Sequence, residues 1–369
     1  MGQPEDGQLA RSPLHDLHVA LGARLVPFAG YEMPVQYPAG IIAEHTHTRE
    51  AASLFDVSHM GQVALRGADA ASALETLVPG DIAGLSAGRM RYTVLTNEKG
   101  GVIDDLMVTN VGDYLFLVIN ASRRTVDTAH LRANLPSNEL EELDRALIAL
   151  QGPAAAPVLD RLAPGAAALD FMQAAPFVVG DVPLAILRSG YTGEDGFEIS
   201  IPSGDAERIA RMLLDDPAVE PAGLGARDSL RLEAGLCLYG NDIDEETSPI
   251  EAGLAWTVAR RRRAEGGFPG AEVILDQLAS GTARRRVGIR PDGRAPARAH
   301  AEIRDTDGAT IGQVTSGGYG PTVGGPIAMG YVASAYAKPG TSVSLLIRNK
   351  TLAGRIVDLP FVPHRYHKN

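Results

Sequence analysis

The pattern of apolar segments changes late in the chain, and this change limits what the chain can fold into. From residue 286 onward, short apolar segments alternate with turns rich in Gly and Pro. These segments span residues 287–289, 328–332, 343–347 and 354–357. Short strands separated by turn signals are typical of a small all-β barrel or sandwich. The change therefore predicts a domain boundary near residues 270–285, followed by a separate all-β domain.

Before that boundary, the patterns of helices and strands are mixed, which indicates the α+β class. The spacing of apolar residues predicts helices over residues 13–25, 41–52 and 206–214, with an ordered loop over 27–37. Between them we expect a strand over 62–65, a helix over 69–78, strands over 92–95, 102–108 and 114–119, a helix from the N-cap Ser122 to about residue 134, and a closing strand over 146–150. This order is typical of a split βαβ sheet with helices on one face.

Charge and cysteine content exclude several classes of protein. The 369 residues carry 34 Lys and Arg against 45 Asp and Glu, a formal net charge of −11, which argues against nucleic-acid binding. The single cysteine, Cys237, cannot form an internal disulfide and fits a reducing compartment. No apolar run approaches the roughly 20 residues that span a bilayer, and the first ten residues resemble neither a signal nor a transit peptide. We therefore expect a cytoplasmic protein with no nucleic-acid or membrane partner.

Two adjacent carboxylates, Asp104 and Asp105, stand in the middle of the otherwise apolar strand at residues 102–108. Because side chains alternate along a strand, one of them faces inward and the other outward. A buried carboxylate must find partners or shift its pKa. The pair is therefore either a set of solvated or turn-bonding acids or a general base that handles a proton.

A second segment, residues 188–198, places acidic residues among glycines. The three acids are Glu194, Asp195 and Glu198. The segment is either a tight turn with solvated acids or a site that directs a carboxylate at a flat heterocycle. One carboxylate can accept hydrogen bonds from the amino group and the adjacent ring N–H of such a heterocycle at the same time.

A third segment, residues 223–235, has the pattern of a helix start with charged residues on it. The charged residues include Arg227, Asp228, Arg231 and Glu233. They either form surface ion pairs, worth about 0–1 kcal/mol each, or belong to a site.

Several common enzyme motifs are absent from the sequence. It contains no phosphate-binding loop, no Gly-x-Ser-x-Gly turn and no His-Glu-x-x-His pair. His45, His47 and His59 are close in sequence, but no other cluster of ligand residues joins them. We therefore expect no metal site.

Eight segments, taken together, resemble the glycine-cleavage T-protein family, and they follow in order along nearly the whole chain. They are residues 28–34, 55–61, 100–105, 190–198, 223–235, 238–244, 314–317 and 360–362. The resemblance implies three domains around a central folate site. We accordingly expect a discontinuous folate-binding core over residues 11–61 and 146–270, a split βαβ subdomain over 62–145 and a C-terminal β-barrel over 284–364.

The same resemblance implies an aminomethyltransferase. Such an enzyme transfers the methylene carbon from the aminomethyl-lipoyl arm of H-protein to tetrahydrofolate, giving 5,10-methylenetetrahydrofolate, ammonia and dihydrolipoyl H-protein. Lipoylated H-protein and tetrahydrofolate are the implied partners, and no metal is required. Asp105 matches the catalytic aspartate of the family, Glu198 its pterin-binding glutamate and Arg227 a folate-site arginine. Further positions that match the cofactor pocket are Asn120, Tyr92, Met60, Tyr191 and, in the C-terminal tail, Tyr366.

Relatives with the same architecture provide the alternatives. The folate domains of dimethylglycine and sarcosine dehydrogenases accompany a flavin domain, and no Gly-x-Gly-x-x-Gly unit opens this chain. The folate-binding iron–sulphur maintenance protein carries a Lys-Gly-Cys-Tyr-x-Gly-Gln-Glu motif, which does not surround Cys237. A folate-dependent demethylase and a non-catalytic folate carrier remain, although simple binding does not require the proton handler Asp105.

Basic residues gather in one part of this acidic chain. Residues 260–298 contain ten arginines against four acidic residues. The segment is either a solvated linker or a docking patch for H-protein, which the family resemblance implies is acidic. A positive patch on a negative protein steers such a partner.

Overall fold

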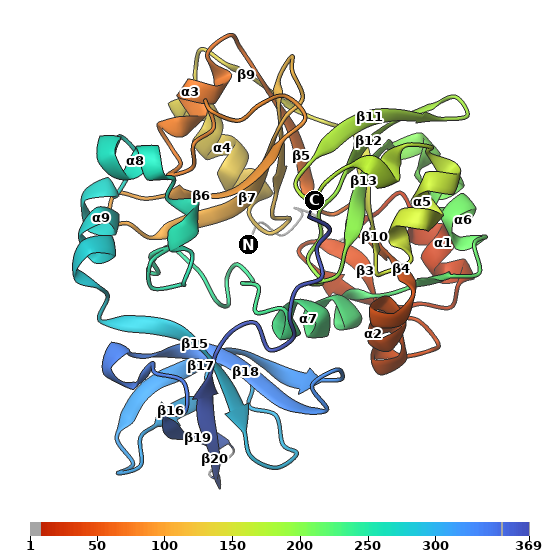
Figure 1. Ribbon diagram of the computed structural model, residues 1–369. Coiled ribbons are helices and arrows are strands. Elements are labelled where there is room, and N and C mark those ends of the chain that lie inside the picture. Colours follow the sequence, from red (N-terminus) through yellow and green to blue (C-terminus); the bar gives the residue numbers. More distant parts are fainter. Residues whose placement is uncertain (1–8, 348–349, 369) are drawn as a thin grey trace.

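The computed structural model describes residues 9–347 and 350–368. In this part of the chain the strands form a three-stranded sheet, a six-stranded sheet, a five-stranded sheet and a closed six-stranded barrel. Figure 1 shows the two larger sheets and the barrel arranged around the middle of the molecule. The α+β class is confirmed, and the all-β C-terminal part is a barrel rather than a sandwich.

The N-terminal segment contains a β-hairpin where the sequence predicted a loop. Its elements are β1 (Ala10–Arg11), α1 (His15–Ala20), β2 (Arg24–Phe28), β3 (Tyr31–Gln36) and α2 (Ile41–Glu50). Ala29 and Gly30 both have positive φ, 49° and 84°, and Phe28 pairs with Tyr31 across them. A two-residue turn of this kind joins hairpin strands. The prediction of a loop over 27–37 is therefore wrong, because the Gly and Pro signals belong to the hairpin.

The six-stranded sheet has the order β11-β12-β13-β10-β4-β14. Its strands are β4 (Ala52–Asp56), β10 (Arg145–Gln151), β11 (Ala174–Val179), β12 (Val182–Leu187), β13 (Gly196–Pro202) and β14 (Val219–Pro221), and its helices are α5 (Ala155–Leu162), η1 (Ala166–Ala168), η2 (Ser203–Asp205), α6 (Ala206–Leu214) and α7 (Leu224–Glu233). The prediction of α6 is confirmed, and Ile209, Ala210 and Leu213 on one face of it are buried in the core of this unit. Helix α7 packs against α2 and against the barrel strand β17, so it connects two units.

The five-stranded sheet has the order β6-β7-β8-β5-β9. Its elements are β5 (Gly61–Arg66), α3 (Ala70–Glu75), β6 (Met90–Thr96), β7 (Val102–Asn110), β8 (Leu115–Ile119), α4 (Arg124–Asn134) and β9 (Glu139–Glu142). Strands β7, β8, β5 and β9 form the expected split βαβ sheet, which β6 extends by one strand. Ser122 is not the N-cap of α4: the cap position is Arg123, and no side chain caps the helix.

The strand predicted to close this unit belongs to the other sheet. Strand β10 pairs with β13 on one side and β4 on the other. Its apolar residues are buried on both faces, as the centre of a large sheet requires. The acidic strand β9 closes the unit instead, and its Glu141 and Glu142 pair with Arg66 and Arg124 at 3.2 and 2.9 Å. These cross-element ion pairs offset the weak strand propensity of β9.

A helical connection leads into the C-terminal barrel, whose strand order is β15-β18-β17-β16-β19-β20. The elements are η3 (Ala255–Thr257), α8 (Arg260–Glu265), α9 (Ala271–Ser280), β15 (Arg284–Pro291), β16 (Glu302–Arg304), β17 (Thr310–Gly320), β18 (Gly325–Ala333), η4 (Ser334–Tyr336), β19 (Ser342–Ile347) and β20 (Lys350–Val357). Ile289, Val314 and Leu345 are among the side chains that fill its interior.

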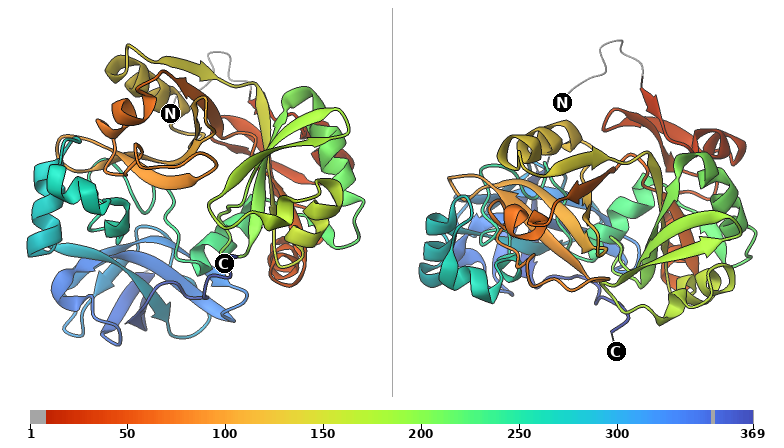
Figure 2. Two further views of the ribbon diagram at one scale, coloured as in Figure 1. Left: turned by 45° about the horizontal axis from the view of Figure 1, so that its top comes forward. Right: turned by 90° about the horizontal axis from the view of Figure 1, so that it is seen from above.

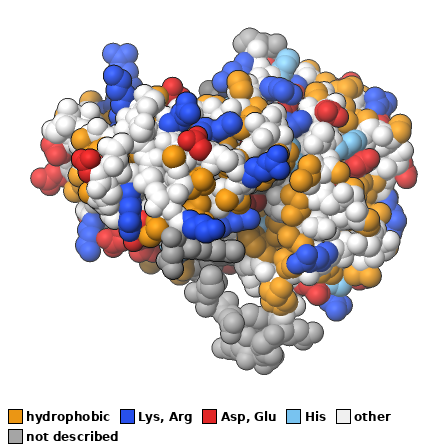
Figure 3. Space-filling view, turned by 90° about the horizontal axis from the view of Figure 1, so that it is seen from below, with side chains coloured by type: hydrophobic (Ala, Val, Ile, Leu, Met, Phe, Trp, Pro, Cys, Tyr) orange, Lys and Arg blue, Asp and Glu red, His pale blue; other side chains and the backbone are white. Residues whose placement is uncertain are grey.

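Three of the four arginines of α8 form hydrogen bonds or ion pairs within the protein. Arg261 pairs with Glu75 at 2.5 Å and with Asp81 at 2.7 Å. Arg262 is buried and donates to the Glu75 carbonyl, whereas Arg263 donates to a carbonyl just before the helix. On the face shown in Figure 3, Lys and Arg side chains are scattered among acidic and apolar ones. These contacts favour a structural role for this part of the basic segment over a docking patch.

After the barrel, the C-terminal segment returns across the other units. The backbone N–H of Val362 donates to Glu233, and that of Arg365 donates to Gly193. The N–H of Phe171 donates to His367. The segment thus joins the barrel to the six-stranded unit, and the left view of Figure 2 shows the barrel and that unit side by side. Within the described residues, every helix is too short or too polar to cross a membrane.

Candidate active site

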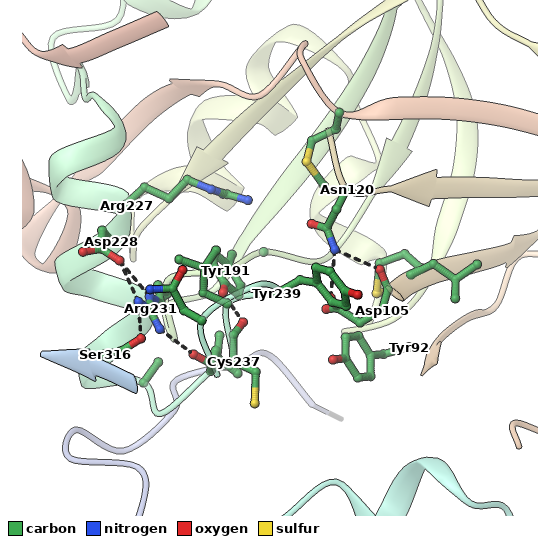
Figure 4. A pocket seen from close by; sticks show the side chains of 18 of the residues that line it. Tyr92, Asp105, Asn120, Tyr191, Arg227, Asp228, Arg231, Cys237, Tyr239 and Ser316 are labelled. Carbon is green, nitrogen blue, oxygen red and sulfur yellow. Dashed lines mark hydrogen bonds and ion pairs between the residues drawn. The ribbon is translucent and has the colours of Figure 1, made fainter. Parts of the chain in front are cut away.

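A cavity of about 1760 Å³ lies where the two larger sheets, α7 and the barrel meet. All eight residues to which the sequence assigned a site role line it: Met60, Tyr92, Asp105, Asn120, Tyr191, Glu198, Arg227 and Tyr366. Their elements are far apart in sequence, so the cavity exists only in the folded chain. Figure 4 shows Tyr92, Asp105 and Asn120 on one side and the residues of α7 on the other.

Strand β7 directs its two aspartates in opposite directions, as the alternation predicted. Asp104 is fully buried behind the sheet, whereas Asp105 lines the cavity. The side chain of Asn120, at the end of β8, donates to Asp105 Oδ1 at 2.8 Å and to Asp104 Oδ1 at 2.9 Å. The carboxylate that reaches the cavity is therefore held by an amide that also contacts its neighbour.

The surroundings of Asp105 shift its protonation toward neutral pH. Burial raises the pKa of Asp105 to about 7, and the charge of Asp104 adds to this increase, while hydrogen bonds from Tyr92 and Asn120 oppose it. Burial and the charge of Asp105 raise the pKa of the Tyr92 hydroxyl, which therefore stays protonated. Near neutral pH, Asp105 can accept a proton or release one, as a general acid–base group must.

The opposite side of the cavity presents a carboxylate and a cation. Ser189 donates to Glu198 Oε2 at 2.7 Å. The guanidinium of Arg227 lies over the Tyr191 ring, 4.8 Å from its centroid, and its Nη1 atom is buried without a hydrogen-bond partner. An unsatisfied buried donor is costly. This side of the cavity can therefore bind a polar ligand through both an acceptor and a donor.

The other acidic residues of the segment 188–198 do not reach the cavity. Asp195 pairs with Arg188 at 2.5 Å, and Glu194 pairs with Arg49 at 2.8 Å. Only Glu198 of the three lines the cavity. Glu194 and Asp195 are therefore held in ion pairs and are not the solvated acids of the first interpretation, and Glu198 stays the candidate for binding a heterocycle.

Apart from Arg227, the charged residues of α7 take part in ion pairs. Arg231 pairs with Asp228 and with Asp242, at 2.8 and 2.7 Å. Glu233 pairs with Arg49 at 3.0 Å. Because Arg231 and Glu233 are buried, these are interior ion pairs and not surface ones as the sequence allowed.

Aromatic side chains form further parts of the cavity wall. Tyr366 stacks on Phe171 with centroids 4.1 Å apart and planes 5° apart, so the C-terminal segment contributes a wall. Trp256 of η3 faces Tyr92 at 5.3 Å and is 61% exposed. The sequence reasoning missed both Trp256 and Phe171, since neither belongs to a polar motif.

His59 is a further residue whose place the sequence did not indicate. It was considered only as a metal ligand, but it lies in the cavity wall with 3% exposure and edge-on to Phe28. Its Nδ1 has no partner. Burial lowers the pKa of His59 to about 4, with the charge of Arg227 adding to this and Asp56 opposing it. At neutral pH the ring is uncharged and can hydrogen-bond to a ligand. The sequence signal that could have indicated His59 as a cavity residue is its position next to Met60.

The other two histidines of that group have different partners. His45 contacts Ser229 at 2.7 Å and Thr322 at 2.9 Å, and His47 contacts the Ala218 carbonyl at 3.1 Å. Across residues 9–347 and 350–368, no group of three or more His, Cys, Asp and Glu could hold a metal ion.

Comparisons with known proteins agree along the whole chain. The family model of the GCVT N-terminal domain matches residues 14–262, and that of the glycine cleavage T-protein C-terminal barrel domain matches 284–363. The chain is 48% identical over 377 residues to a mitochondrial aminomethyltransferase of Solanum tuberosum, with 98% of this chain and 92% of the relative covered. A mitochondrial aminomethyltransferase of Gallus gallus is 47% identical over 369 residues, with 97% and 94% covered.

A solved structure extends this agreement to three dimensions. The crystal structure of glycine cleavage system aminomethyltransferase T from Bartonella henselae matches with a TM-score of 0.94 and 46% identity, covering 98% of this chain and 100% of that one. The order of the matching segments, the three units and the cavity between them lead to the same result. The chain belongs to the glycine cleavage T-protein family.

Proposed function

We propose that this aminomethyltransferase of the glycine cleavage system binds tetrahydrofolate in the central cavity and receives the aminomethyl group from lipoylated H-protein. The observation that carries this proposal is the position of Asp105: a carboxylate with a pKa of about 7 in a large cavity, facing a wall that offers an acceptor and an unsatisfied cation. The reaction joins one carbon to two nitrogens of the folate and so requires a group that handles a proton.

The wall formed by β13 and α7 fits the pterin end of a folate. Glu198 offers a carboxylate to the amino group and the adjacent ring N–H of a pterin, a pair of donors that one carboxylate accepts together. Ser189 orients that carboxylate at 2.7 Å. Arg227 has a free donor, Nη1, for a pterin acceptor. We assign pterin binding to Glu198 and Arg227, with Tyr191 and Met60 as packing surfaces.

We assign the proton transfer of the reaction to Asp105. Its ionised form accepts the proton that a folate nitrogen loses as the methylene bridge closes, and its negative charge stabilises positive charge at the transferred carbon. Tyr92 and Asn120 hold the carboxylate in place from two sides. Tyr366 closes the cavity from the C-terminal segment.

The partner and the location belong to this proposal as well. An H-protein would present its lipoyl arm at the mouth of the cavity, and no nucleic acid, membrane or metal takes part. A cytoplasmic location stays a prediction, since the curated relatives are described as mitochondrial.

The test is a complete turnover with purified components. Aminomethylated H-protein and tetrahydrofolate are mixed with the enzyme, and ammonia and 5,10-methylenetetrahydrofolate are followed together. Both should appear in equal amounts, and omission of tetrahydrofolate should slow ammonia release strongly. If folate binds but neither product forms above the enzyme-free rate, the chain is a carrier. If a methylated amine replaces H-protein as the donor, it is a demethylase.

A further inference from the structure

Behind Asp105 lies a second pair of carboxyl groups that the proposed chemistry does not use. Asp104 of β7 and Asp127 of α4 are both fully buried. Neither one forms an ion pair within the described part of the chain. Two buried carboxylates without a cation are expensive to ionise together, so the pair requires another explanation.

The contact between the two side chains supplies it. Among the residues that the structure describes, no N–H or O–H group donates to either oxygen of Asp127. The remaining neighbour is the Asp104 carboxyl group, and burial, together with a hydrogen bond between the two, holds the pKa of Asp104 well above its usual value. A carboxylate has no proton to donate, so two carboxyl groups form such a bond only when one of them is protonated. One shared proton would satisfy both groups, and burial, which raises the pKa of each of them, favours its retention.

Asn120 connects this pair to the cavity. The backbone N–H of Asn120 donates to Asp104 Oδ2 at 3.3 Å, and its Nδ2 donates to Asp104 Oδ1 at 2.9 Å. The same Nδ2 donates to the Asp105 side chain at 2.8 Å and to the Asp105 carbonyl at 3.1 Å. The orientation of this amide, and with it the Asp105 carboxylate, depends on where Asp104 presents its acceptors.

We propose that Asp104 and Asp127 share one proton and that this pair, acting through Asn120, positions the Asp105 carboxylate and limits the negative charge beside it. The proposal rests on the proposed role of Asp105 as the proton-handling group. Asp104 and Asp127 are positioning residues, since neither one lines the cavity.

Several charged or titratable groups surround Asp104 and Asp127 and influence the protonation of the pair. They are Asp105 on β7, Tyr92 on β6, Arg123 before α4, and Tyr239 and Glu245 on the loop after α7. Arg123 favours the ionised form of Asp127, but its guanidinium also pairs with Glu245 at 2.8 Å and lies over the Tyr239 ring. Its charge is therefore divided, and burial still raises the pKa of Asp127 above its usual value.

Two substitutions that preserve shape should move the pKa of Asp105 in opposite directions. In Asp127→Asn, the new amide donates to Asp104 and removes the competing carboxylate, so Asp104 holds the whole charge directly beside Asp105. The pKa of Asp105 should then rise. In Asp104→Asn, the amide oxygen still accepts from Asn120 and the charge moves to the more distant Asp127, so the pKa of Asp105 should fall. Moving part of one charge by a few ångströms at the effective dielectric of a protein predicts shifts of roughly 0.5–1 pH unit.

The direct experiment is a carbon NMR titration of the full-length enzyme labelled at the aspartate carboxyl carbons. The Asp105 signal is identified by its loss in Asp105→Asn. We expect one carboxyl group of the pair to stay protonated above pH 7 in the unsubstituted enzyme, and the Asp105 midpoint to move up in Asp127→Asn and down in Asp104→Asn. Asp113→Asn, on the exposed loop after β7, is the matched control and should move nothing. Full ionisation of both members by about pH 5, or an unmoved Asp105 midpoint in both variants, would overturn the proposal.

Turnover measurements separate this proposal from the one on which it depends. The acid limb of the pH profile of kcat/KM should follow the NMR midpoints in both variants. A purely structural pair would lower kcat and the unfolding temperature without moving that limb. If Asp105→Asn retains turnover, the catalytic role of Asp105 is wrong, while the NMR titration still decides whether the pair shares a proton.

Discussion

Two buried groups of carboxylates, one at β7 and one at the end of α7, have opposite partners. Asn120 donates to Asp104 and to Asp105, Asp127 lies beside Asp104, and none of the three aspartates forms an ion pair within residues 9–347 and 350–368. Glu233 instead pairs with Arg49 at 3.0 Å and with His45 at 3.1 Å and accepts a backbone N–H from Thr322 at 2.8 Å. In the described part of the chain, the first group has no ion-pair partner, whereas the second is surrounded by donors.

The pKa shifts of the two groups are therefore opposite in direction. Burial raises the pKa of Asp105 to about 7. Burial also acts against the charge of Glu233, but the hydrogen bond and charge of His45, together with Thr322 and Arg49, hold the pKa of Glu233 at about 2. The ionised carboxylate of Glu233 therefore stabilises the fold. The ionised carboxylate of Asp105 destabilises it, because burial disfavours its charge.

The largest expected effect is the loss of turnover in Asp105→Asn. The substitution keeps the shape and removes the base, so kcat should fall by about 10²–10⁴-fold with little change in folate affinity. Steady-state kinetics and calorimetry measure the two quantities. Asp104→Asn should lose much less activity. Equal losses in the two variants would show that Asp105 is the wrong choice.

The next effect is on stability and has opposite signs in the two groups. Glu233→Gln breaks a buried ion pair and should destabilise the protein by about 3–5 kcal/mol at pH 7. Because the pKa of Glu233 is lowered on folding, its contribution is present above the unfolded value and is lost as pH falls toward 2. The loss in the variant should therefore shrink below about pH 4. Chemical denaturation across this pH range measures it.

Asp105→Asn should instead stabilise the protein, and only at higher pH. The pKa of Asp105 is raised on folding from about 4 in the unfolded chain to about 7. Folding is therefore penalised progressively as pH rises between these values, and Asn removes the penalty. The gain should reach on the order of 2–4 kcal/mol at pH 8 and vanish at pH 4. Destabilisation at pH 8 would mean that the Asp105 carboxylate is well compensated in the fold.

A smaller effect is expected for folate binding at Glu198. Glu198→Gln removes a charge-assisted acceptor worth about 1.5–3 kcal/mol, so the folate Kd should rise by roughly 10- to 150-fold. Calorimetry with tetrahydrofolate checks this. Glu194→Gln is the comparison, since Glu194 pairs with Arg49 away from the cavity, and it should leave the Kd unchanged. Unchanged affinity in Glu198→Gln would remove this residue from the site.

The smallest effect is expected for α8. Arg261→Gln loses its contacts with Glu75 and Asp81 and should lower the unfolding midpoint modestly. If Arg261 is structural, the KM for aminomethylated H-protein at low salt should stay within about twofold of the unsubstituted value. A docking role would instead slow association with H-protein and raise this KM. A large, salt-dependent rise in KM with unchanged stability would restore the docking patch.

Local pattern was enough for much of the fold. The period of two along β7 separated Asp104 from Asp105, and the period of 3.6 along α6 identified Ile209 and Leu213 as buried. The change to short strands after residue 286 indicated the barrel. In each case, the physical reason is that backbone geometry repeats within a few residues, so neighbours in sequence report on one another.

The sequence by itself thus determined many of the elements, the α+β class and the family, and through the matching motifs it named eight residues that line one cavity. Only the tertiary structure decided which charges remain free. It paired Asp195 with Arg188 and left Glu198 in the cavity, and it assigned strand β10 to the six-stranded sheet. It also placed Asp127 of α4 against Asp104 and left the Nδ1 atom of His59 without a hydrogen-bond partner among the described residues. These outcomes depend on contacts between residues far apart in the chain, and a local pattern holds no information about which distant group fills the space beside a side chain.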